Sequence, residues 1–328
     1  IAWRVRVNGL LLAGLAGADS GGRIAPAVGG TDQTLQVPLP PQDSEIQIFA
    51  ESRNGISSPA LVRVTWAGAA AASAGSFNRA PKLYVLAVGV GAYLHAQVGR
   101  LNFPAKDARD FANVMRAQQG RLYREVEVRL LQDSQATRDE VVDGLDWLQK
   151  QVTQHDVAML FMAGHGVNDP TQGYTFLPFN ADPERLKRTG VSMAEVRNTL
   201  NSLAGKALFF FDTCHAGNVL GEARRALSND VSGVINELAS AENGVVVFSS
   251  STGRQFSYED PKWGNGAFTK ALVQGLGGAA AQPGNPRITH KMLDYYISDE
   301  VKRLTGGKQT PVTQAPGGVP DFPVAVKE

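Results

Sequence analysis

Apolar and polar residues alternate in short runs over about the first 67 residues of the chain. The apolar positions of these runs are Val5, Val7, Leu35, Val37, Leu39, Ile46, Ile48, Val62, Val64 and Trp66. Turn-forming pairs such as Asn8-Gly9 and Asn54-Gly55 separate the runs. A period of two with frequent turns is typical of strands that turn one side to a core. The pattern predicts a small antiparallel β domain over residues 1–67.

The stretch from Ser44 to Val64 has Asn54-Gly55 at its middle and predicts a hairpin. We expect it to close an immunoglobulin-like β-sandwich whose early strands are truncated. The chain begins at Ile1, inside a predicted strand, so we expect a fragment or a processed product. Residues 68–80 are rich in Ala, Gly and Ser and have no apolar face, which predicts a flexible linker.

From Pro81 onward, strands alternate with helices. Residues 83–90 form a continuous apolar run, as expected for a strand buried on both faces of a parallel sheet. Further strands are predicted at 126–131, 157–162, 174–179, 207–211 and 245–249, and helices at 105–117, from Thr137 through Leu148, and at 193–203, 268–276 and 290–304. This alternation implies right-handed crossovers and an open, mostly parallel sheet with helices on both faces. The prediction is an α/β domain over residues 81–328.

Composition narrows the class of protein without indicating a function. Hydrophobic residues make up 43% of the chain and charged residues 19%, as in ordinary globular proteins. The 32 basic and 31 acidic side chains nearly cancel, so no net field favours nucleic acid or an anionic membrane. Apolar stretches fall short of the roughly 20 residues that span a bilayer, and we expect a cytoplasmic location. The single cysteine excludes an intramolecular disulfide and a purely thiolate zinc site.

Two predicted strands end in residues that suit nucleophilic catalysis. The strand DVAMLFMAG leads into His165, and the strand KALFFFD leads into Thr213 and Cys214. In open α/β sheets, ligands and chemistry gather at the carboxyl ends of the strands. If the two strands are parallel neighbours, an imidazole beside the thiol can take its proton and favour the thiolate. We therefore predict Cys214 as the nucleophile and His165 as its general base.

Neighbouring residues extend this candidate site. The backbone amides of Gly166 and Cys214 are candidate donors to a tetrahedral oxyanion, and Gly166 leaves room for a substrate backbone. His215 follows the nucleophile, but adjacent residues of an extended segment face opposite sides, so we give it a structural role. Ser249 and Ser250 end the strand at 245–249, where their hydroxyl groups can line a substrate cleft.

These motifs occur in the order found in the peptidase domain of caspases and metacaspases, which residues 82–328 resemble. They are LYVLAVGV followed by AKDARDF, AGHG at 163–166, DTCHAG at 212–217, FSSS at 248–251 and GNGAFTKAL at 264–272. The base precedes the nucleophile by 49 residues (214 − 165), close to the separation of about 50 in caspases. The D-x-C-H-x-G form is most similar to prokaryotic metacaspase-like members. The resemblance implies a caspase-like αβα sandwich with cysteine endopeptidase activity.

The resemblance also implies a substrate preference. In metacaspases, which cleave after Arg or Lys, an Asp two residues before the catalytic Cys lines the primary specificity pocket, and Asp212 matches it. Asp107 of AKDARDF matches a second Asp of that pocket. Two desolvated carboxylates would attract a guanidinium or ammonium group. Metacaspases often have Ser two residues before the catalytic His, whereas this chain has Ala163, which leaves the choice between Arg and Lys open.

The polar segment 218–230 follows the nucleophile and contains Arg224 and Arg225. We hypothesise an activation loop that the enzyme cuts after one of these arginines; the alternative is an exposed loop with two solvated side chains. The chemistry requires no cofactor or metal. Many metacaspases need calcium, but no loop of clustered acids marks a site. The expected partners are a protein or peptide substrate and a regulatory module or partner protein bound by the β domain.

Two other functions stay open. An Asp-specific caspase-like peptidase would share the pair of Cys214 and His165, but a preference for Asp would contradict the role given to Asp212. A non-catalytic scaffold would use the caspase fold for binding alone, and the intact Cys–His pair argues against it.

Overall fold

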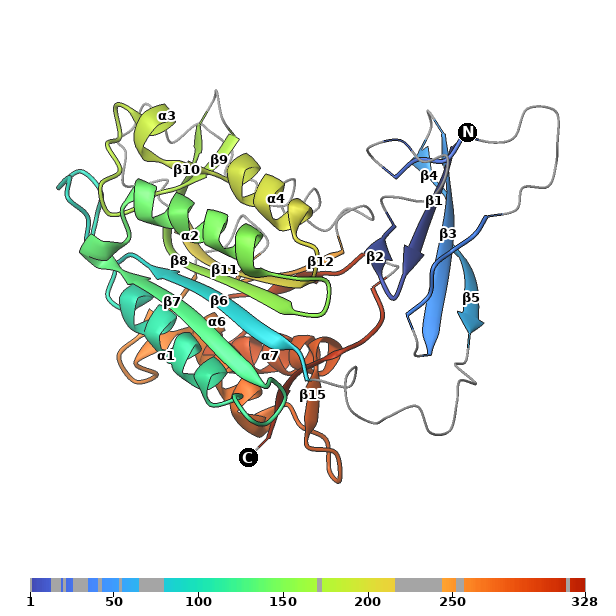
Figure 1. Cartoon of the computed structure of the whole chain (residues 1–328). Helices are drawn as coiled ribbons and strands as arrows, with labels where there is room; N and C mark the ends of the chain where they lie inside the picture. The colour runs from blue at the N-terminus through green and yellow to red at the C-terminus, as the bar shows by residue number, and fades with distance from the viewer. Residues whose placement is uncertain are drawn as a thin grey trace. The chain divides into compact units, whose positions relative to one another are not determined.

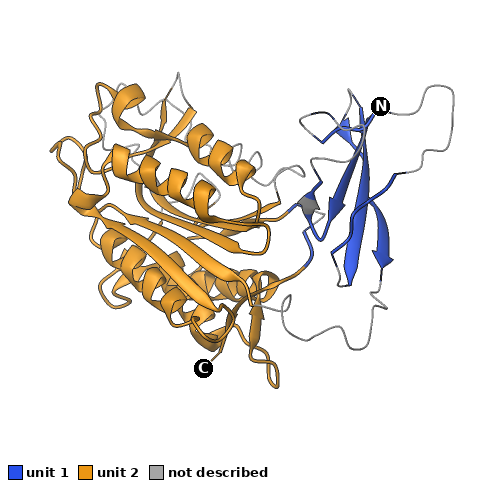
Figure 2. Ribbon diagram, viewed as in Figure 1, with its two compact units in different colours: residues 1–79, 316–320 blue, residues 80–315, 321–328 orange. Residues whose placement is uncertain are grey.

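The structure is a computed structural model that describes most of the chain. The described residues are 2–12, 19, 22–25, 35–40, 43–52, 55–64, 80–169, 173–215, 244–251, 257–316 and 319–327. The chain divides into two units, blue and orange in Figure 2: Ile1–Arg79 with Pro316–Pro320, and Ala80–Ala315 with Asp321–Glu328. Nearly all of the predicted linker, residues 68–79, lies outside the described residues.

The described strands of the first unit form one antiparallel sheet, as the alternating pattern predicts (Figure 1). They are β1 (Ala2–Val7), β2 (Leu10–Leu11), β3 (Ser44–Ser52), β4 (Gly55–Ile56) and β5 (Ala60–Val64). β3 is central, since it pairs with β1 and also with β4 and β5. The predicted hairpin is present, with β3 pairing antiparallel to β5 between Ser44↔Val64 and Ile48↔Ala60.

One run of the N-terminal pattern forms no strand. Leu35, Val37 and Leu39 alternate with other residues, yet residues 35–40 have no regular secondary structure. Pro38 and Pro40 explain this, because proline lacks the N–H group that a strand ladder uses. The three apolar side chains still pack against the core of this sheet, whose buried members are Val5, Val7, Ile24 and Ile46.

Among the described residues of the second unit, eight strands form one mostly parallel sheet, which confirms the predicted α/β fold class. The parallel strands are β6 (Lys82–Gly89), β7 (Glu125–Gln132), β8 (Val157–Asp169), β11 (Lys206–His215) and β12 (Val245–Ser249). The antiparallel additions are β9 (Gly173–Phe176), β10 (Val191–Ser192) and β16 (Val312–Gln314). Two small pairs lie outside this sheet: β13 (Glu259–Asp260) with β14 (Asn265–Gly266), and β15 (Arg287–Thr289) with β17 (Pro323–Val326).

Helices cover both faces of the sheet, as predicted. α2 (Arg138–Gln151) and α4 (Met193–Ser202) lie on one face, and α1 (Pro104–Arg116), α6 (Ala267–Gln274) and α7 (His290–Thr305) lie on the other (Figure 1). A short helix, α3 (Leu186–Thr189), precedes β10. α2 begins where the sequence indicates, because the Thr137 side chain accepts the N–H of Glu140. α6 ends earlier than predicted, in a π-helical turn at Gly275–Ala279 where Gly278 has a φ of 126°.

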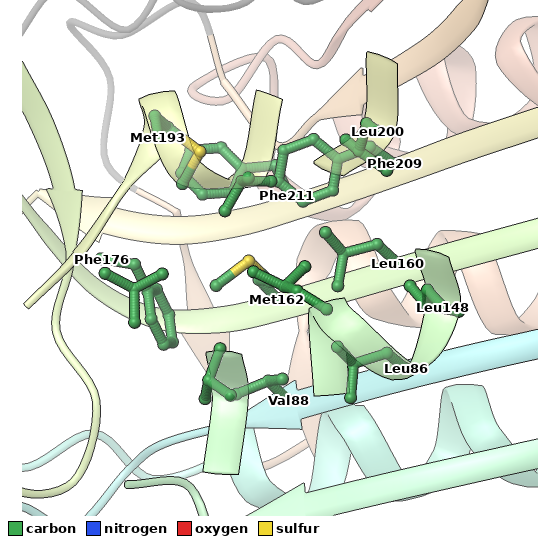
Figure 3. Close-up of a cluster of buried hydrophobic side chains, with 14 of the residues drawn as sticks. Leu86, Val88, Leu148, Leu160, Met162, Phe176, Met193, Leu200, Phe209 and Phe211 are labelled. Carbon is green, nitrogen blue, oxygen red and sulfur yellow. The ribbon is translucent and has the colours of Figure 1, made fainter. Parts of the chain in front are cut away.

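Apolar side chains fill both interfaces between the sheet and its helices. On the side of α2 and α4, the cluster drawn in Figure 3 includes Leu86, Leu148, Leu160, Met162, Leu200, Phe209 and Phe211. On the side of α1, four phenylalanine rings pack in a chain, with centroid distances of 4.9 Å for Phe111–Phe161, 5.2 Å for Phe111–Phe210 and 5.0 Å for Phe210–Phe248. Burying each such side chain stabilises the fold by about 1.5–3 kcal/mol.

β16 is the last strand on the β12 side of the described sheet. It pairs antiparallel with β12 over three positions, from Val247↔Gln314 to Ser249↔Val312. Pro311 precedes the strand and Pro316 follows it closely. Among the helices that the structure describes, none has the length and apolar character to cross a membrane.

Candidate active site

β8 and β11 run further than the sequence predicts and carry the candidate catalytic residues within the ladder. The two strands pair in parallel over ten positions, from Lys206↔Val157 to His215↔Gly166. Cys214 is the register partner of His165. Neighbouring strands lie about 4.8 Å apart, so the two backbones are this close at the pair. The side chains of Cys214 and His215 lie outside the described part of the chain.

One edge of β8 changes partner just before His165. β6 pairs in parallel with β8 up to Gly89↔Ala163, and β9 pairs antiparallel with it from Gly166↔Phe176 onward. Gly164 lies between the two ladders with a φ of 151°, which side chains rarely tolerate. The base candidate is therefore held by main-chain pairing on either side.

The His165 imidazole is buried and fixed at one nitrogen. Its side chain is 4% exposed, and Nε2 lies 2.9 Å from the carbonyl oxygen of Gly99. Because a carbonyl oxygen only accepts hydrogen bonds, Nε2 carries the proton in the neutral ring. Nδ1 is also buried and has no hydrogen-bond partner within the described residues. Burial lowers the pKa of His165, and the hydrogen bond to Gly99 opposes this in part.

Tyr93 supports the same histidine through its backbone. The Tyr93 hydroxyl accepts the N–H of His165 at 2.8 Å and donates to the carbonyl of Val90 at 3.0 Å. Its ring packs on the imidazole, with centroids 5.3 Å apart and planes inclined at 31°. Tyr93 and Gly99 both belong to the segment between β6 and α1, which the sequence did not mark as functional.

Tyr174 fills the space beside Gly166. A β-carbon added at Gly166 would lie 2.2 Å from the Tyr174 hydroxyl oxygen, closer than atoms can approach. The same hydroxyl lies 2.7 Å from that of Thr213 on β11. We predicted that glycine here makes room for substrate, and the structure gives a second reason: the glycine makes room for a tyrosine that joins β9 to β11.

The two predicted specificity residues, Asp107 and Asp212, come together on the α1 face of the sheet. Asp107 in α1 is 2% exposed, and Asp212 in β11 is 6% exposed. A β-carbon added at Gly266 would lie 3.2 Å from Asp212 Oδ2 and 3.3 Å from Asp107 Oδ2, so both carboxylates border this glycine. Ala163 is the register partner of Asp212, which puts a methyl group next to the carboxylate where metacaspases often have a serine.

Each carboxylate receives hydrogen bonds from neighbouring elements. Asp107 accepts from the Asn265 side chain at 2.8 Å and from the N–H of Gly266 at 3.3 Å. Asp212 accepts from the Thr269 hydroxyl at 2.8 Å. Burial is the main cause that raises the pKa of both groups, and for Asp107 the nearby charge of Asp212 raises it further. The pair therefore resists carrying two negative charges unless a cation is present.

The predicted serines differ in what they contact. Ser250 hydrogen-bonds Asp212 and lies 2.6 Å from the hydroxyl of Ser257, which also hydrogen-bonds Asp212. Ser249 is buried and donates instead to the backbone carbonyl of Ser251. Gln309 is fully buried and links Ser250 to Tyr258. Its side-chain amide donates to the Ser250 carbonyl at 2.9 Å, and its side-chain oxygen accepts the N–H of Tyr258 at 2.9 Å.

Some site predictions fall on residues without a described structure. Arg224 and Arg225, with the rest of the segment 218–230, lie outside the described residues. Within the described residues, no group of three or more His, Cys, Asp or Glu side chains is arranged to hold a metal ion. Sequence analysis assigned no role to Asn265 or Thr269. Both lie in the motif GNGAFTKAL at 264–272, and their membership of that motif is the signal that could have identified them.

Comparison with known proteins identifies the family. The caspase-domain family model, peptidase C14, matches residues 82–317, well over half of the chain. A crystal structure of a protein from Geobacter sulfurreducens is similar in fold, with a TM-score of 0.51 and 20% sequence identity, covering 76% of this chain and 95% of that one. No curated protein matches the chain significantly. A caspase domain supports a cysteine-peptidase-like function with protein substrates. The chain belongs to the caspase-domain family of peptidases.

Proposed function

We propose that the protein is a cysteine endopeptidase in which Cys214 attacks the peptide bond and His165 accepts the thiol proton. The observation that carries the proposal is the tautomer of the His165 imidazole. Nε2 is fixed on the Gly99 carbonyl, and buried Nδ1 has no partner among the described residues, on a strand whose register pairs His165 with Cys214. A neutral imidazole with its lone pair on Nδ1 is the form that a general base requires.

The reaction follows the usual order for a thiol nucleophile. The proton of the Cys214 thiol moves to His165 Nδ1, and the sulfur attacks the carbonyl carbon to give a tetrahedral oxyanion. The intermediate collapses to a thioester as the C–N bond breaks, and the imidazolium gives its proton to the leaving amine. Water then attacks the thioester with His165 as base, which releases the acid and restores the thiol. We assign the oxyanion contacts to the backbone amides of Gly166 and Cys214.

We further propose that the enzyme cleaves after Arg or Lys. The support is the pair Asp107 and Asp212, two buried carboxylates that border the same glycine, Gly266. Within the described residues, the groups that donate hydrogen bonds to the two carboxylates are neutral: those of Asn265, Gly266, Thr269 and two serines. Burial of a charge is costly without a partner, so a cationic substrate side chain would offset the cost of burying these carboxylates. Arg can bind two carboxylate oxygens at once.

Fluorogenic peptides that differ only at the cleaved residue test both parts of this proposal. The peptides carry Arg, Lys, Asp or Ala before the leaving group, and Cys214→Ala serves as the inactive control. We expect turnover of the Arg or Lys peptides by the wild type and none by the variant. Preferred cleavage after Asp would overturn the role of Asp212 but keep the peptidase. No turnover of any peptide, with or without calcium and after limited proteolysis, would favour a scaffold.

A further inference from the structure

We infer that Asp133 is a positioning residue for His165. It fixes the start of the segment 91–101, whose Tyr93 hydroxyl and Gly99 carbonyl hold the histidine. The inference rests on the proposed role of His165 as general base. It concerns a carboxylate just after the end of β7, two strands away from β8 in the sheet, which acts on His165 through other residues.

One oxygen of Asp133 organises the turn that leaves β6. Oδ1 accepts the backbone N–H of Gly91 and that of Ala92, each at 2.9 Å. The Asp133 carbonyl also accepts the N–H of Ala136 at 2.8 Å, which closes the short 3₁₀ turn after β7. Hydrogen bonds to a charged acceptor are about twice as strong as neutral ones. The carboxylate therefore ties the end of β7 to the first two residues of the segment 91–101.

Asp133 makes these contacts in a strained backbone conformation. Its φ is 43°, and Asn8 is the other residue besides glycine with a positive φ among the described residues. The left-handed region costs most residues about 1–2 kcal/mol; Asp and Asn tolerate it better because their short polar side chains hydrogen-bond locally, and glycine would avoid the cost. Glycine has no side-chain oxygen, however, and would lose both contacts to Gly91 and Ala92. Strain of this kind persists where the surrounding structure needs the side chain, and it clusters at functional sites.

The segment 91–101 carries the effect of Asp133 to the imidazole. Gly91, held by Asp133, accepts the N–H of Leu101 at 2.9 Å, which closes the segment on itself. A β-carbon at Gly91 would lie 2.7 Å from the Leu101 carbonyl oxygen, so this closure depends on glycine. Gly99 lies two residues before Leu101, and Tyr93 lies two residues after Gly91. Both groups that hold His165 are therefore within two residues of the closure.

Other anchors keep the remainder of the segment in place. The N–H of Leu94 donates to the carbonyl of Phe179 at 2.9 Å, and Val98 is buried in a cluster with Val167 and Leu177. Loss of the Asp133 contacts should therefore loosen the ends of the segment without unfolding it. The expected result is an imidazole whose Nε2 contact to Gly99 is weakened, and whose proton is no longer confined to Nε2.

Three variants separate the effect of the Asp133 hydrogen-bond acceptor from the effect of its strained backbone conformation. Asp133→Asn keeps an oxygen at the same place and tolerates a positive φ; Asp133→Ala removes the acceptor and keeps the strain; Asp133→Gly removes both. Asp143→Ala, an exposed acid of α2, is the matched control. The readouts are kcat and KM on the Arg peptide, Tm, and the ¹⁵N chemical shifts of the His165 ring, which report the tautomer. His165→Gln assigns those signals among the five histidines.

We expect Asp133→Ala and Asp133→Gly to lower kcat by about ten- to a hundred-fold, because small misplacement of a catalytic group has effects of this size. KM should stay within about two-fold, and the ring should change from the Nε2-protonated tautomer to a mixture. Asp133→Asn, which keeps the oxygen without the charge, should lose clearly less kcat than Asp133→Ala. The control should stay near the wild type in all readouts. Wild-type kcat and tautomer in Asp133→Ala would overturn the inference, as would equal losses in Asp133→Asn. If the wild type itself lacks turnover, the proposed function fails separately, and the tautomer still decides the role of Asp133.

Discussion

Tyr93 holds His165 at two points: its hydroxyl accepts the His165 backbone N–H at 2.8 Å, and its ring lies 5.3 Å from the imidazole centroid. The ring covers the histidine while the hydroxyl fixes its backbone. Together with the Gly99 carbonyl, this arrangement keeps the imidazole buried and gives it a defined tautomer. Burial has a consequence for titration, because it disfavours the charged form of the ring.

The first prediction concerns the pH dependence of turnover. Burial lowers the pKa of His165 below its ordinary value of about 6.5, so the ring stays neutral to lower pH than a solvent-exposed histidine. A general base must be neutral, and kcat on an Arg peptide should therefore fall only below about pH 6.5. A pH profile of kcat at saturating substrate measures this. His155→Gln, at an exposed position, should leave the acid limb in place, and an acid limb above about pH 6.5 would contradict the prediction.

The second prediction separates activity from stability at Asp212. Its pKa is raised, mainly by burial, so the charged carboxylate costs folding energy near neutral pH. We expect Asp212→Asn to lower kcat/KM for Arg peptides by about 30-fold or more, as for loss of one partner in a buried charge pair worth about 2–5 kcal/mol.

The same variant should be at least as stable as the wild type near neutral pH, and this difference should shrink at low pH, where the carboxyl group is protonated in both folded and unfolded chains. Thermal unfolding at several pH values measures it. Asp143→Asn, an exposed acid in α2, provides the control. A clear loss of stability in Asp212→Asn, or unchanged kcat/KM, would argue against a carboxylate kept for binding a cation.

The third prediction tests the close approach of Tyr174 to Gly166. An alanine at 166 would put its β-carbon 2.2 Å from the tyrosine hydroxyl oxygen, so the ring must move. We expect Gly166→Ala to destabilise the fold by about 1–3 kcal/mol, the usual range for overpacking, with a lower Tm in thermal unfolding.

Gly277→Ala is the matched control, since an added β-carbon there meets nothing within 4 Å. The double variant Gly166→Ala/Tyr174→Ala should lose less stability than the two single variants added together, because removal of the ring relieves the clash. Additive losses of stability would mean that the clash with Tyr174 does not cause the destabilisation by Gly166→Ala.

The fourth prediction concerns the segment that contains Arg224 and Arg225. A peptidase with the proposed preference should cut its own chain after one of these residues. Mass spectrometry of the purified wild type should find the corresponding fragments, and Cys214→Ala should remain intact. Arg224→Gln/Arg225→Gln in the active background serves as the cleavage-site control. The same fragments from Cys214→Ala would assign the cut to another protease.

The central strands β6, β8, β11 and β12 could be predicted because each contains a continuous apolar run, and Val245–Ser249 matches its predicted bounds. The short strands β10 and β13 to β17 were not predicted. The extension of β8 beyond Met162 could not be predicted in this way. Residues 163–169, AGHGVND, contain two glycines and polar side chains and have no strand pattern. They are extended because β11 and β9 pair with them, which is a tertiary effect. In the first unit, proline overrode an alternating pattern at residues 35–40.

The proximity of Asp107 and Asp212 could be predicted from the motifs, because the resemblance to metacaspases assigns both residues to the same specificity pocket. Gly99 and Tyr93 could not be found by the same route. A backbone carbonyl that accepts from an imidazole has no side-chain signature, and a tyrosine in a turn-rich segment resembles any packed aromatic residue. The role of Asp133 is also invisible in sequence, since the pattern does not reveal its positive φ or its two backbone contacts.

The shortness of β16 has a consequence for how copies of this protein can associate. A free sheet edge is a template for another chain, and long flat edges invite one sheet to continue into the next. In the described sheet, the edge beyond β12 is a three-residue strand, with Pro311 before it and Pro316 shortly after it. Such an edge offers few backbone groups to a neighbour, so side-by-side growth of the sheet gains little there.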